Sequence, residues 1–381
     1  MLIEFAASTT APLPAMYLGS LSFLLLGAVA GLVGSYAIPA IDPAPTEPTP
    51  YALALPRGFP TPVIPADNPL TKEGVALGRM LFYEKALSST GTMACGSCHQ
   101  QSKAFTDGLP FAMGVDGTAN PRGTMSLANV LWSTQLAWDG GFTTLETQAL
   151  KPLENTSELH QLLTVGVSRL QATTNYPALF QTAFGTKTIT NNLVLKALAQ
   201  FERTLISSNS RYDKFAATRQ GFTNEEVAGL QLYTTHIAPG VVRGAECFHC
   251  HTQPLMSSTY EGKFFNNGLD LTFTDIGRGS VTGLAIDKGK FIAPTLRNIA
   301  LTAPYMHDGR FKTLEEVLDH YSDHVQMTSP GLDNNLLNVT NDPPFGKHID
   351  LTASEKKQLL AFLNTLTDST FITDKRFSNP F

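Results

Sequence analysis

Cys95-Gly96-Ser97-Cys98-His99 and Cys247-Phe248-His249-Cys250-His251 are two copies of one pattern, C-x-x-C-H. This pattern is the attachment signature of a c-type haem, because each thiol can form a thioether with a haem vinyl group and the adjacent histidine then supplies an iron ligand. The two copies use all four cysteines of the chain. A redox Cys-x-x-Cys pair and a four-cysteine zinc site are the alternatives, but neither explains a histidine directly after both pairs. The sequence therefore predicts two covalently bound haem c groups.

The composition of the 381 residues is that of a globular protein. Hydrophobic residues make up 43% and charged residues 15% of the chain, which allows a sizeable core. A net charge of −5 gives no reason to expect nucleic acid as a partner.

Residues 1–40 are predicted to be a transmembrane anchor or a signal peptide. Tyr17 to Ile38 are predominantly apolar and long enough to cross a bilayer. This stretch exceeds the apolar core of about 7–15 residues in signal peptides, so we favour an uncleaved anchor. A signal peptide cleaved near Ser35-Tyr36-Ala37 is the alternative. Residues 41–65 contain eight prolines and predict an extended linker that holds the globular part off the membrane. Because haem c is attached outside the bacterial cytoplasmic membrane, both alternatives place the body in the periplasm.

The sequence around each haem motif is partly repeated. Gly78-x-x-Leu81-Phe82 returns as Gly229-x-x-Leu232-Tyr233, and the two glycines precede the first cysteine of their motifs by 17 and 18 residues. Downstream, Leu198, Phe201 and Leu205 have the same helical spacing as Leu359, Phe362 and Leu366. These paired echoes indicate a duplicated unit of helix, haem loop and closing helix.

Outside the haem motifs, most of the sequence signals are those of helices. Thr71 is a predicted N-cap with Glu73 in the first turn of a helix that runs to Leu87, and Thr352 with Glu355 forms a capping box. Strand signals are sparse. We therefore predict a mainly α fold with two cytochrome c-like domains in tandem, an N-terminal domain at 66–210 and a C-terminal domain at 211–381.

These motifs resemble the bacterial dihaem cytochrome c peroxidases and the related MauG enzymes from Pro69 to Leu366. Besides the haem loops, the resemblance is carried by Leu77-Gly78-Arg79, Trp138-Asp139-Gly140, Phe201-Glu202-Arg203-Thr204, Asn267-Gly268-Leu269, Pro294-Thr295-Leu296-Arg297-Asn298 and Thr302-Ala303-Pro304-Tyr305-Met306-His307-Asp308-Gly309-Arg310.

The resemblance implies that peroxide reacts at the haem on His99. The family has a Gln and a Glu above the open face of this haem, and their positions fall on Gln148 and Glu158. A carboxyl there can move a proton between the peroxide oxygens. Read without the resemblance, Glu158 is a solvated charge with Glu154 and Glu146 as nearby rivals. Trp138 matches the Trp that passes electrons between the two haems, whereas Trp132 has no such register and is expected in the core.

Two positions depart from the peroxidase pattern. The histidine that blocks the peroxide iron in the peroxidases is replaced by Val115, which cannot ligate iron. This haem is therefore expected to be five-coordinate, unless Met113 or His160 substitutes.

The distal ligand of the second haem, a Met in the peroxidases, falls on Tyr321, as in MauG. A phenolate ligand is expected to lower the reduction potential of that haem. Tyr321 continues an apolar helical spacing of Leu314, Val317 and Leu318, so a core tyrosine is the simpler interpretation. Other donors near this position are His320, His324 and Met327, whereas the family register does not make Met306 the ligand.

The resemblance also implies a calcium ion between the haem domains. Thr302 and Pro304 match the positions that give backbone carbonyls, but the usual Asn is replaced by Gly123, so the ion is expected to bind more water.

The expected activity is reduction of hydrogen peroxide with electrons from a small cytochrome c or copper protein. The alternative is a MauG-like oxidation of a residue on a partner protein, which Val115 and Tyr321 together favour. A third hypothesis, a non-catalytic dihaem electron-transfer cytochrome, requires both irons to be six-coordinate.

Overall fold

The computed structural model describes residues 47–337, 339–341 and 348–381. The predicted anchor or signal peptide at residues 1–40 lies outside these residues, as does the beginning of the proline-rich segment. No helix in the described part is both long enough and apolar enough to span a membrane.

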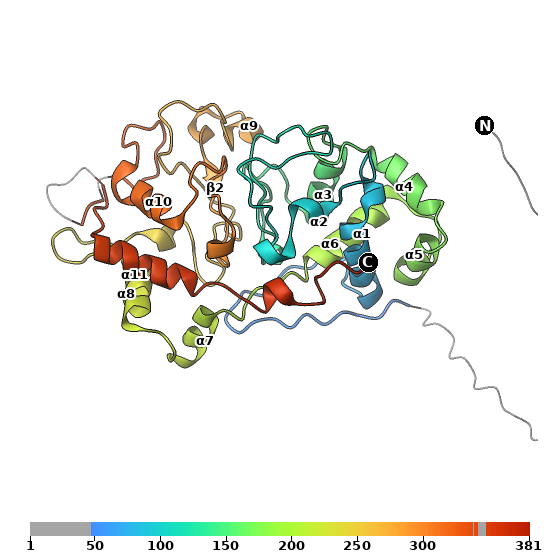
Figure 1. Cartoon of the computed structure of the whole chain (residues 1–381), viewed down its shortest axis with the longest axis horizontal. Coiled ribbons are helices and arrows are strands. Elements are labelled where there is room, and N and C mark those ends of the chain that lie inside the picture. Colours follow the sequence, from blue (N-terminus) through green and yellow to red (C-terminus); the bar gives the residue numbers. More distant parts are fainter. Residues whose placement is uncertain (1–46, 338, 342–347) are drawn as a thin grey trace, which may run out of the picture. The chain divides into compact units, whose positions relative to one another are not determined.

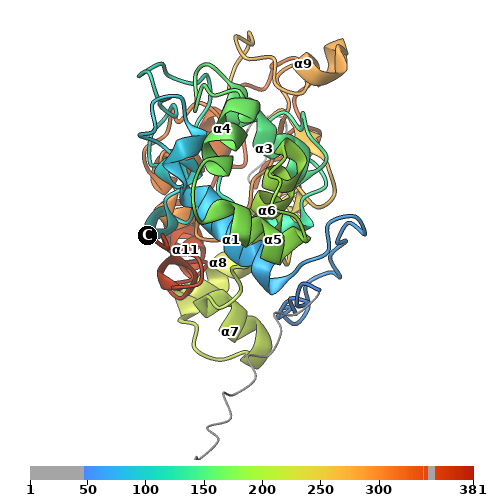
Figure 2. The same ribbon diagram turned by 90° about the vertical axis from the view of Figure 1, so that its right-hand side faces the viewer.

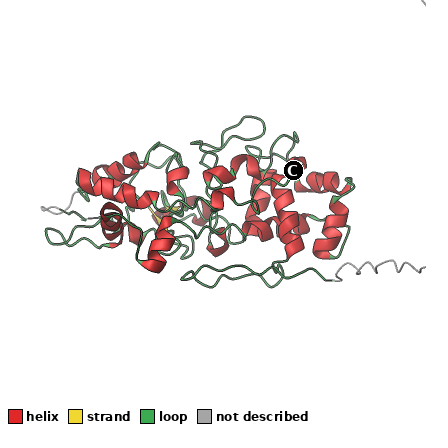
Figure 3. Ribbon diagram, turned by 60° about the horizontal axis from the view of Figure 1, so that its bottom comes forward, coloured by secondary structure: helices red, strands yellow, loops and turns green. Residues whose placement is uncertain are grey.

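The described chain is mainly helical, as predicted (Figure 3). Its only paired strands are β1 and β2, which run antiparallel with Phe264 opposite Ile292. The α-helices are α1 (Lys72–Tyr83), α2 (Cys95–Cys98), α3 (Leu145–Glu154), α4 (Leu163–Gln171), α5 (Tyr176–Phe184), α6 (Asn191–Glu202), α7 (Arg211–Thr218), α8 (Asn224–Thr234), α9 (Gly279–Thr282), α10 (Leu314–Asp319) and α11 (Ala353–Asn364), and the strands are β1 (Phe264–Phe265) and β2 (Phe291–Ile292).

The first helix begins where the sequence predicts and ends earlier. Thr71 is the N-cap of α1, and its hydroxyl accepts a hydrogen bond from the Gly74 N–H. The predicted continuation to Leu87 is wrong, because α1 ends at Tyr83. The Glu84 side chain then accepts a hydrogen bond from the Ala86 N–H and caps a separate 3₁₀ turn.

The repeated sequence signals correspond to repeated helix pairs. α1 packs against α6, and α8 packs against α11. A Cβ at Gly78 would collide with the Ala197 carbonyl on α6, and a Cβ at Gly229 would collide with the Gln358 carbonyl on α11. Glycine therefore permits the same close helix approach in both pairs.

The aromatic contacts of the two helix pairs also match. The ring centroids of Phe82 and Phe201 lie 5.2 Å apart, and those of Tyr233 and Phe362 are separated by the same 5.2 Å. The predicted capping box at Thr352 and Glu355 is present at the start of α11. The structure thus bears out the repeated helix–loop–helix unit.

Two hydrophobic clusters lie in different halves of the described chain. One contains side chains from Leu77 to Leu205, and the other contains side chains from Tyr212 to Leu366. Figure 1 shows α8, α10 and α11 in the half that holds the second cluster, and Figure 2 shows α1, α5 and α6 side by side in the other. The C-terminal segment returns to the first half, where Phe371 and Phe377 join the first cluster. The boundary at 210/211 remains a prediction.

The described part of the proline-rich segment is extended but packs against the body. The Trp132 indole N–H donates a 2.7 Å hydrogen bond to the Pro60 carbonyl, and the Phe59 ring lies 5.2 Å from that indole. The Arg297 guanidinium lies 4.8 Å from the centre of the Phe59 ring. Aromatic and hydrogen-bonding side chains thus attach Phe59 and Pro60 to the body, and the role of residues 41–65 as a linker remains a prediction.

Candidate dihaem site

The first C-x-x-C-H motif forms a short helix at the edge of a cavity. Cys95 and Cys98 are the first and last residues of α2, and His99 follows as its C-cap. The His99 Nδ1 lies 2.9 Å from the Phe105 carbonyl. Because burial lowers the pKa of His99, the ring is neutral, and donation from Nδ1 leaves the Nε2 lone pair free. Metal-ligating histidines commonly carry this backbone hydrogen bond on the other nitrogen.

Gln148 and Glu158 line the same cavity as Cys95, Cys98 and His99. Burial raises the pKa of Glu158 above its usual range, although the Asn155 side chain donates a 2.7 Å hydrogen bond to its Oε1. A carboxyl with a raised pKa can both accept and release a proton near neutral pH. The structure therefore brings together the residues that the family register identified.

The two rival carboxylates lie elsewhere. Glu146 forms a 2.8 Å ion pair with Arg203, and Glu154 accepts a hydrogen bond from the Leu163 N–H. Burial by itself raises the pKa of Glu146, but Arg203 and Asn68 outweigh it and bring the pKa below its usual value. Neither side chain lines the cavity.

Glu202 also lines this cavity, and the sequence analysis gave it no role. Burial raises its pKa to about 8, against a lowering by Arg203. Its carboxyl is therefore protonated at neutral pH and can donate a hydrogen bond. The sequence did contain a sign that Glu202 is buried. Glu202 follows Leu198 by four residues and thus lies on the apolar stripe of α6.

Val115 does not line the first cavity, whereas Met113 does. The Val115 N–H donates a 2.8 Å hydrogen bond to the Glu158 carbonyl, so the loop is attached to the segment that carries the candidate proton carrier. His160 is exposed and does not line the cavity. Of the two substitute ligands considered, only Met113 reaches the cavity.

The second C-x-x-C-H motif lines a second and larger cavity. Cys247, Cys250 and His251 all contribute to its wall. The His251 Nδ1 lies 3.0 Å from the Pro294 carbonyl, and burial lowers the pKa of this histidine to about 4. The Tyr233 hydroxyl donates a hydrogen bond to the His251 carbonyl. His251 is therefore held as His99 is, neutral and with Nε2 free.

Tyr321 lies on the wall of this second cavity. Leu314, Val317 and Leu318 line it as well, so the apolar face predicted from their spacing points at the haem site. Tyr321 lies in a π-helical turn, His320–His324, that directly follows α10. Such turns are frequent at functional sites. The Tyr321 hydroxyl oxygen accepts a 3.2 Å hydrogen bond from the Asn267 side chain, and burial raises its pKa.

The nearby alternatives to Tyr321 do not line the cavity. His320 is buried with its Nε2 lying 3.1 Å from the Asn267 carbonyl, and His324 is exposed with its Nδ1 near the Asp319 carbonyl. Met327 does not contribute to the wall, whereas Met306 does. Tyr321 and Met306 are thus the two candidate donors that the structure places beside the second motif.

Trp138 lines the second cavity and contacts residues of both halves. Its indole N–H donates to the Gly123 carbonyl at 2.9 Å, and its ring lies edge-on to the His307 ring with centroids 6.5 Å apart. His307 stacks on Phe291 with centroids 4.0 Å apart. Trp132, by contrast, is 3% exposed and lies in a separate apolar cluster, as expected of a core residue.

An ion-pair network holds the segments around Trp138. Arg122 contacts Asp139 at 2.5 Å and Asp275 at 2.7 Å. Asp139 directly follows Trp138, and Arg122 directly precedes Gly123. Charge-assisted bonds of this kind fix the two loops relative to each other.

Thr302, Pro304 and Gly123 also line the second cavity. The Gly123 carbonyl already accepts the Trp138 indole N–H. The three positions implied for calcium therefore line one cavity, and backbone oxygens are donors that calcium prefers.

The donor sets fit two haem groups. Each cavity has two cysteines that form no disulfide and the histidine of the attachment motif, His99 or His251, with its Nε2 free. The apolar side chains around each motif supply the surroundings that a porphyrin ring requires.

Comparison with known proteins identifies the family of this chain. Residues 72–221 match the family model described as di-haem cytochrome c peroxidase. The methylamine utilization protein MauG of Methylophilus methylotrophus is 32% identical over 79% of this chain and 84% of its own length. The cytochrome c551 peroxidase of Nitrosomonas europaea is 30% identical over 67% of this chain and 75% of its own.

A solved structure is also similar to this chain in sequence and in fold. The crystal structure of a MauG-like protein associated with microbial copper homeostasis is 36% identical, with a TM-score of 0.78, and covers 87% of this chain and 99% of that one. The resemblance predicted from the motifs is confirmed: the chain belongs to the di-haem cytochrome c peroxidase and MauG family of haem-containing oxidoreductases.

Proposed function

We propose that the protein uses hydrogen peroxide to oxidise a residue on a partner protein, in the manner of the MauG branch of its family. The observation that carries this proposal is the pair of departures from the peroxidase pattern. Tyr321 lines the second cavity, and Val115 lies outside the first. The overall reaction balances because the residue on the partner protein loses two electrons and two protons, which hydrogen peroxide takes up to give two water molecules.

The residues of the first cavity would carry out the proton chemistry. When bound, the haem supplies the redox chemistry with peroxide. The Glu158 carboxylate takes the proton from one peroxide oxygen and returns it to the other, which its raised pKa permits. The Gln148 amide, from the same wall, orients the peroxide by hydrogen bonding. The protonated Glu202 keeps a second negative charge out of the cavity.

Trp138 would connect the two haems. Its indole lies against His307 and is held to Gly123 by the 2.9 Å hydrogen bond. An indole is more easily oxidised than the other aromatic side chains of this region. The Trp138 indole is therefore the side chain best suited to carry electrons out of the second cavity.

Tyr321 would supply the distal ligand in the second cavity. Burial alone keeps its hydroxyl protonated, whereas coordination to a haem iron bound in this cavity would favour the phenolate, as metal ions do for their ligands. The Asn267 side chain donates to the same oxygen and further favours the phenolate.

The proposal is tested by asking whether a small redox protein supplies the reducing electrons. The holoprotein is mixed with peroxide in the presence and absence of reduced cytochrome c, and peroxide consumption is followed at steady state. We expect cytochrome c to accelerate consumption less than twofold. Acceleration of a hundredfold or more would contradict the proposal and support the second function below.

The second candidate function is reduction of peroxide with electrons from a small cytochrome c or copper protein. It is favoured by the complete set of Gln148, Glu158 and Trp138, which both branches of the family share, and by relatives named as cytochrome c peroxidases. A non-catalytic electron-transfer cytochrome is the least supported hypothesis, because the acid–base carboxyl of Glu158 in the first cavity has no use in it.

We propose further that both haems are covalently attached through Cys95, Cys98, Cys247 and Cys250, and that the body lies in the periplasm, anchored or released. The two C-x-x-C-H motifs support the covalent attachment, and haem attachment of this type takes place outside the cytoplasmic membrane, which supports the location. Denaturing electrophoresis with haem staining of periplasmic and membrane fractions tests them, and haem lost on denaturation or confined to the cytoplasm would contradict them.

Calcium at Thr302 and Pro304 is also a proposal. Both positions line the wall shared with Trp138, and backbone oxygens suit calcium. Treatment with a calcium chelator is expected to slow electron exchange between the haems. An unchanged exchange rate, with no calcium in the untreated protein, would refute it.

A further inference from the structure

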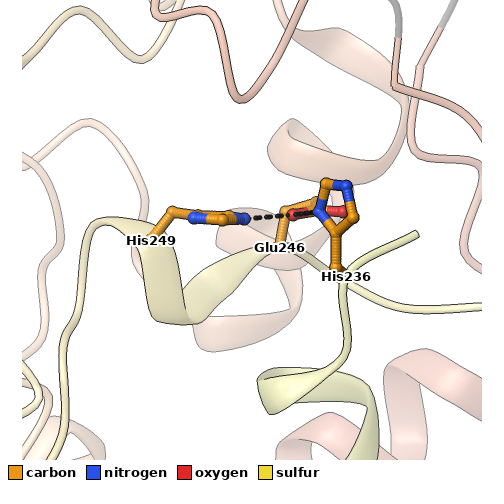
Figure 4. A group of neighbouring side chains, drawn as sticks. All are labelled: His236, Glu246 and His249. Carbon is orange, nitrogen blue, oxygen red and sulfur yellow. Dashed lines mark hydrogen bonds and ion pairs between the residues drawn. The ribbon is translucent and has the colours of Figure 1, made fainter.

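Three side chains beside the second haem motif converge on one point that the proposed reaction does not use. They are His236, Glu246 and His249, and one potential ligand atom from each lies within 4.8 Å of the other two. Figure 4 shows the two imidazole rings pointing from opposite sides toward the Glu246 carboxylate. We infer that this cluster is a binding site for a borderline divalent transition ion such as Zn²⁺ or Cu²⁺.

The backbone holds the three ligands in place. His236 lies just after the end of α8, and the Ala245 N–H donates a 2.9 Å hydrogen bond back to the Leu232 carbonyl of that helix. This bond closes the loop and brings Glu246 beside His236. Glu246 Oε1 accepts a 2.5 Å hydrogen bond from the Ile237 N–H, which orients the carboxylate and leaves Oε2 for the histidines.

One polar atom of the cluster lacks a hydrogen-bond partner among the described residues, although the others have one. The His249 Nε2 lies 2.7 Å from Glu246 Oε2, yet it is buried and makes no well-directed hydrogen bond to any described residue. The His236 Nδ1 lies 3.1 Å from the same oxygen. Two imidazole nitrogens thus face one carboxylate oxygen, and a shared ion would give the His249 Nε2 the partner that it lacks.

The charge balance supports a cation. The Glu246 side chain is 2% exposed, and its ion pairs among the described residues are with the two histidines only. A buried carboxylate requires a compensating positive charge. A divalent ion supplies that charge while both histidines remain neutral ligands.

The donors also select the class of metal. Two imidazoles and one carboxylate suit Zn²⁺ and Cu²⁺, whereas Ca²⁺ and Mg²⁺ prefer all-oxygen sites. A tetrahedral ion about 2.1 Å from each ligand separates the ligands by about 3.4 Å. The carboxylate oxygen therefore has to move away by less than about 1 Å, and the two imidazole nitrogens have to approach each other by at most about 1.4 Å. His236 is 72% exposed at the side chain, which leaves one coordination position open to water or to a ligand from a partner.

The position of the cluster gives the ion a place beside the second haem. His249 lies between Cys247 and Cys250 in the attachment motif. The bound ion would therefore link the loop after α8 to the loop that carries the second haem motif. It would also place a positive charge next to the second haem.

The test uses holoprotein with both haems attached. The protein is stripped with a chelator, equilibrated with zinc chloride in the presence of excess calcium chloride, and desalted, and zinc is counted against iron. We expect one zinc per two irons in the wild type. Glu246→Gln and His236→Ala should retain less than a tenth of that, and His160→Ala, an exposed histidine in the other half, should retain it all.

The variants are chosen to keep the fold. His236 is largely exposed, and Gln at position 246 preserves the acceptor for the Ile237 N–H. With Cu²⁺ in place of zinc, electron paramagnetic resonance should show coupling to two imidazole nitrogens in the wild type and to one in His236→Ala. Absence of zinc from the wild type, equal retention in all variants, or identical nitrogen coupling would each overturn the site.

Discussion

The Trp138 indole N–H donates a 2.9 Å hydrogen bond to the Gly123 carbonyl, and the Gly123 N–H donates a 2.9 Å hydrogen bond to the His307 carbonyl. The peptide segment at Gly123 is thereby held between the indole and the loop that carries Met306 and His307. Because the Trp138 ring also lies edge-on to the His307 ring, the indole has little freedom to reorient.

Trp138→Phe should weaken electronic communication between the haems without altering their separate spectra. Phenylalanine keeps most of the packing volume but is much harder to oxidise than indole, and it cannot donate to Gly123. Rapid mixing with peroxide should show oxidation confined to the His99 haem. If oxidation of the two haems proceeds as in the wild type, the connecting role is refuted.

The His99 haem should be high-spin in the oxidised protein and should bind cyanide without prior reduction. The reason is that Val115 lies outside the cavity and offers no ligand atom. Optical and electron paramagnetic resonance spectra with cyanide test this. A fully low-spin spectrum that cyanide leaves unchanged would contradict the prediction.

Met113→Leu tests whether the Met113 thioether is a ligand of the iron in the His99 haem. Met113 lines the first cavity, so its thioether is the one substitute ligand within reach. We expect the variant to have the same spin state as the wild type. A conversion from low-spin to high-spin in this variant alone would identify Met113 as a ligand.

Glu158→Gln should slow the step that follows peroxide binding by about 10²–10⁴-fold, the usual contribution of one positioned acid–base group. The amide keeps the hydrogen-bonding shape but cannot take up a proton. Stopped-flow mixing with peroxide measures the effect. Glu154→Gln is the matched control and should react at the wild-type rate, because Glu154 lies outside the cavity. The assignment fails if the two variants behave in the opposite way.

Glu202 should make the protein less stable as the pH rises. Its pKa is about 8 in the folded protein and 4.5 in the absence of burial, so the folded state holds one more proton between these values. The free energy of unfolding contributed by this group is therefore fully present below pH 4.5 and lost as the pH passes 8.

Glu202→Gln isolates this contribution, because glutamine resembles the protonated acid at every pH. Unfolding by guanidinium chloride at pH 5.5 and pH 8.5 should show a smaller loss of stability in the variant than in the wild type. The exposed Glu225→Gln serves as control and should follow the wild type. Equal losses in all three proteins would show that Glu202 is ionised when folded.

The parts of the fold that follow from local chemistry were predictable. Thr71 caps α1 and Thr352 caps α11 because each hydroxyl meets an N–H three residues on, a short-range geometry that the sequence encodes directly. Gly78 and Gly229 were likewise informative, since only a missing Cβ allows the two helix crossings. Each haem motif was predictable because its two cysteines and its histidine lie within five consecutive residues, so their spacing follows from the sequence alone.

The parts that depend on distant contacts were not predictable. The end of α1 at Tyr83 is set by Glu84, whose side chain prefers the Ala86 N–H and the Tyr176 hydroxyl over a further helical turn. The attachment of residues 47–65 to the body depends on where Trp132 and Arg297 lie in space. The cluster of His236, Glu246 and His249 depends in the same way on the loop that returns to α8.

Tyr321 decides between the two enzymatic functions, because an oxygen ligand and a sulfur ligand give the second haem different properties. Tyr321 and Met306 both line the second cavity, and the Asn267 amide contacts each of them, at 3.2 Å and 3.5 Å. A phenolate stabilises the oxidised iron more than a thioether does and lowers the reduction potential. The two candidate ligands can therefore be told apart in the same protein.

Tyr321→Phe should remove a phenolate-to-iron charge-transfer band from the resonance Raman spectrum of the ferric protein and raise the reduction potential of the His251 haem. The phenyl ring fills the same space but carries no oxygen, so the iron loses its sixth ligand and becomes able to bind cyanide. Met306→Leu is the matched control and should leave the Raman band and the potential unchanged. If instead the Met306 variant opens the iron and the Tyr321 variant keeps the wild-type spectrum, the ligand is the thioether. The protein would then belong with the peroxidases that draw electrons from a small redox partner.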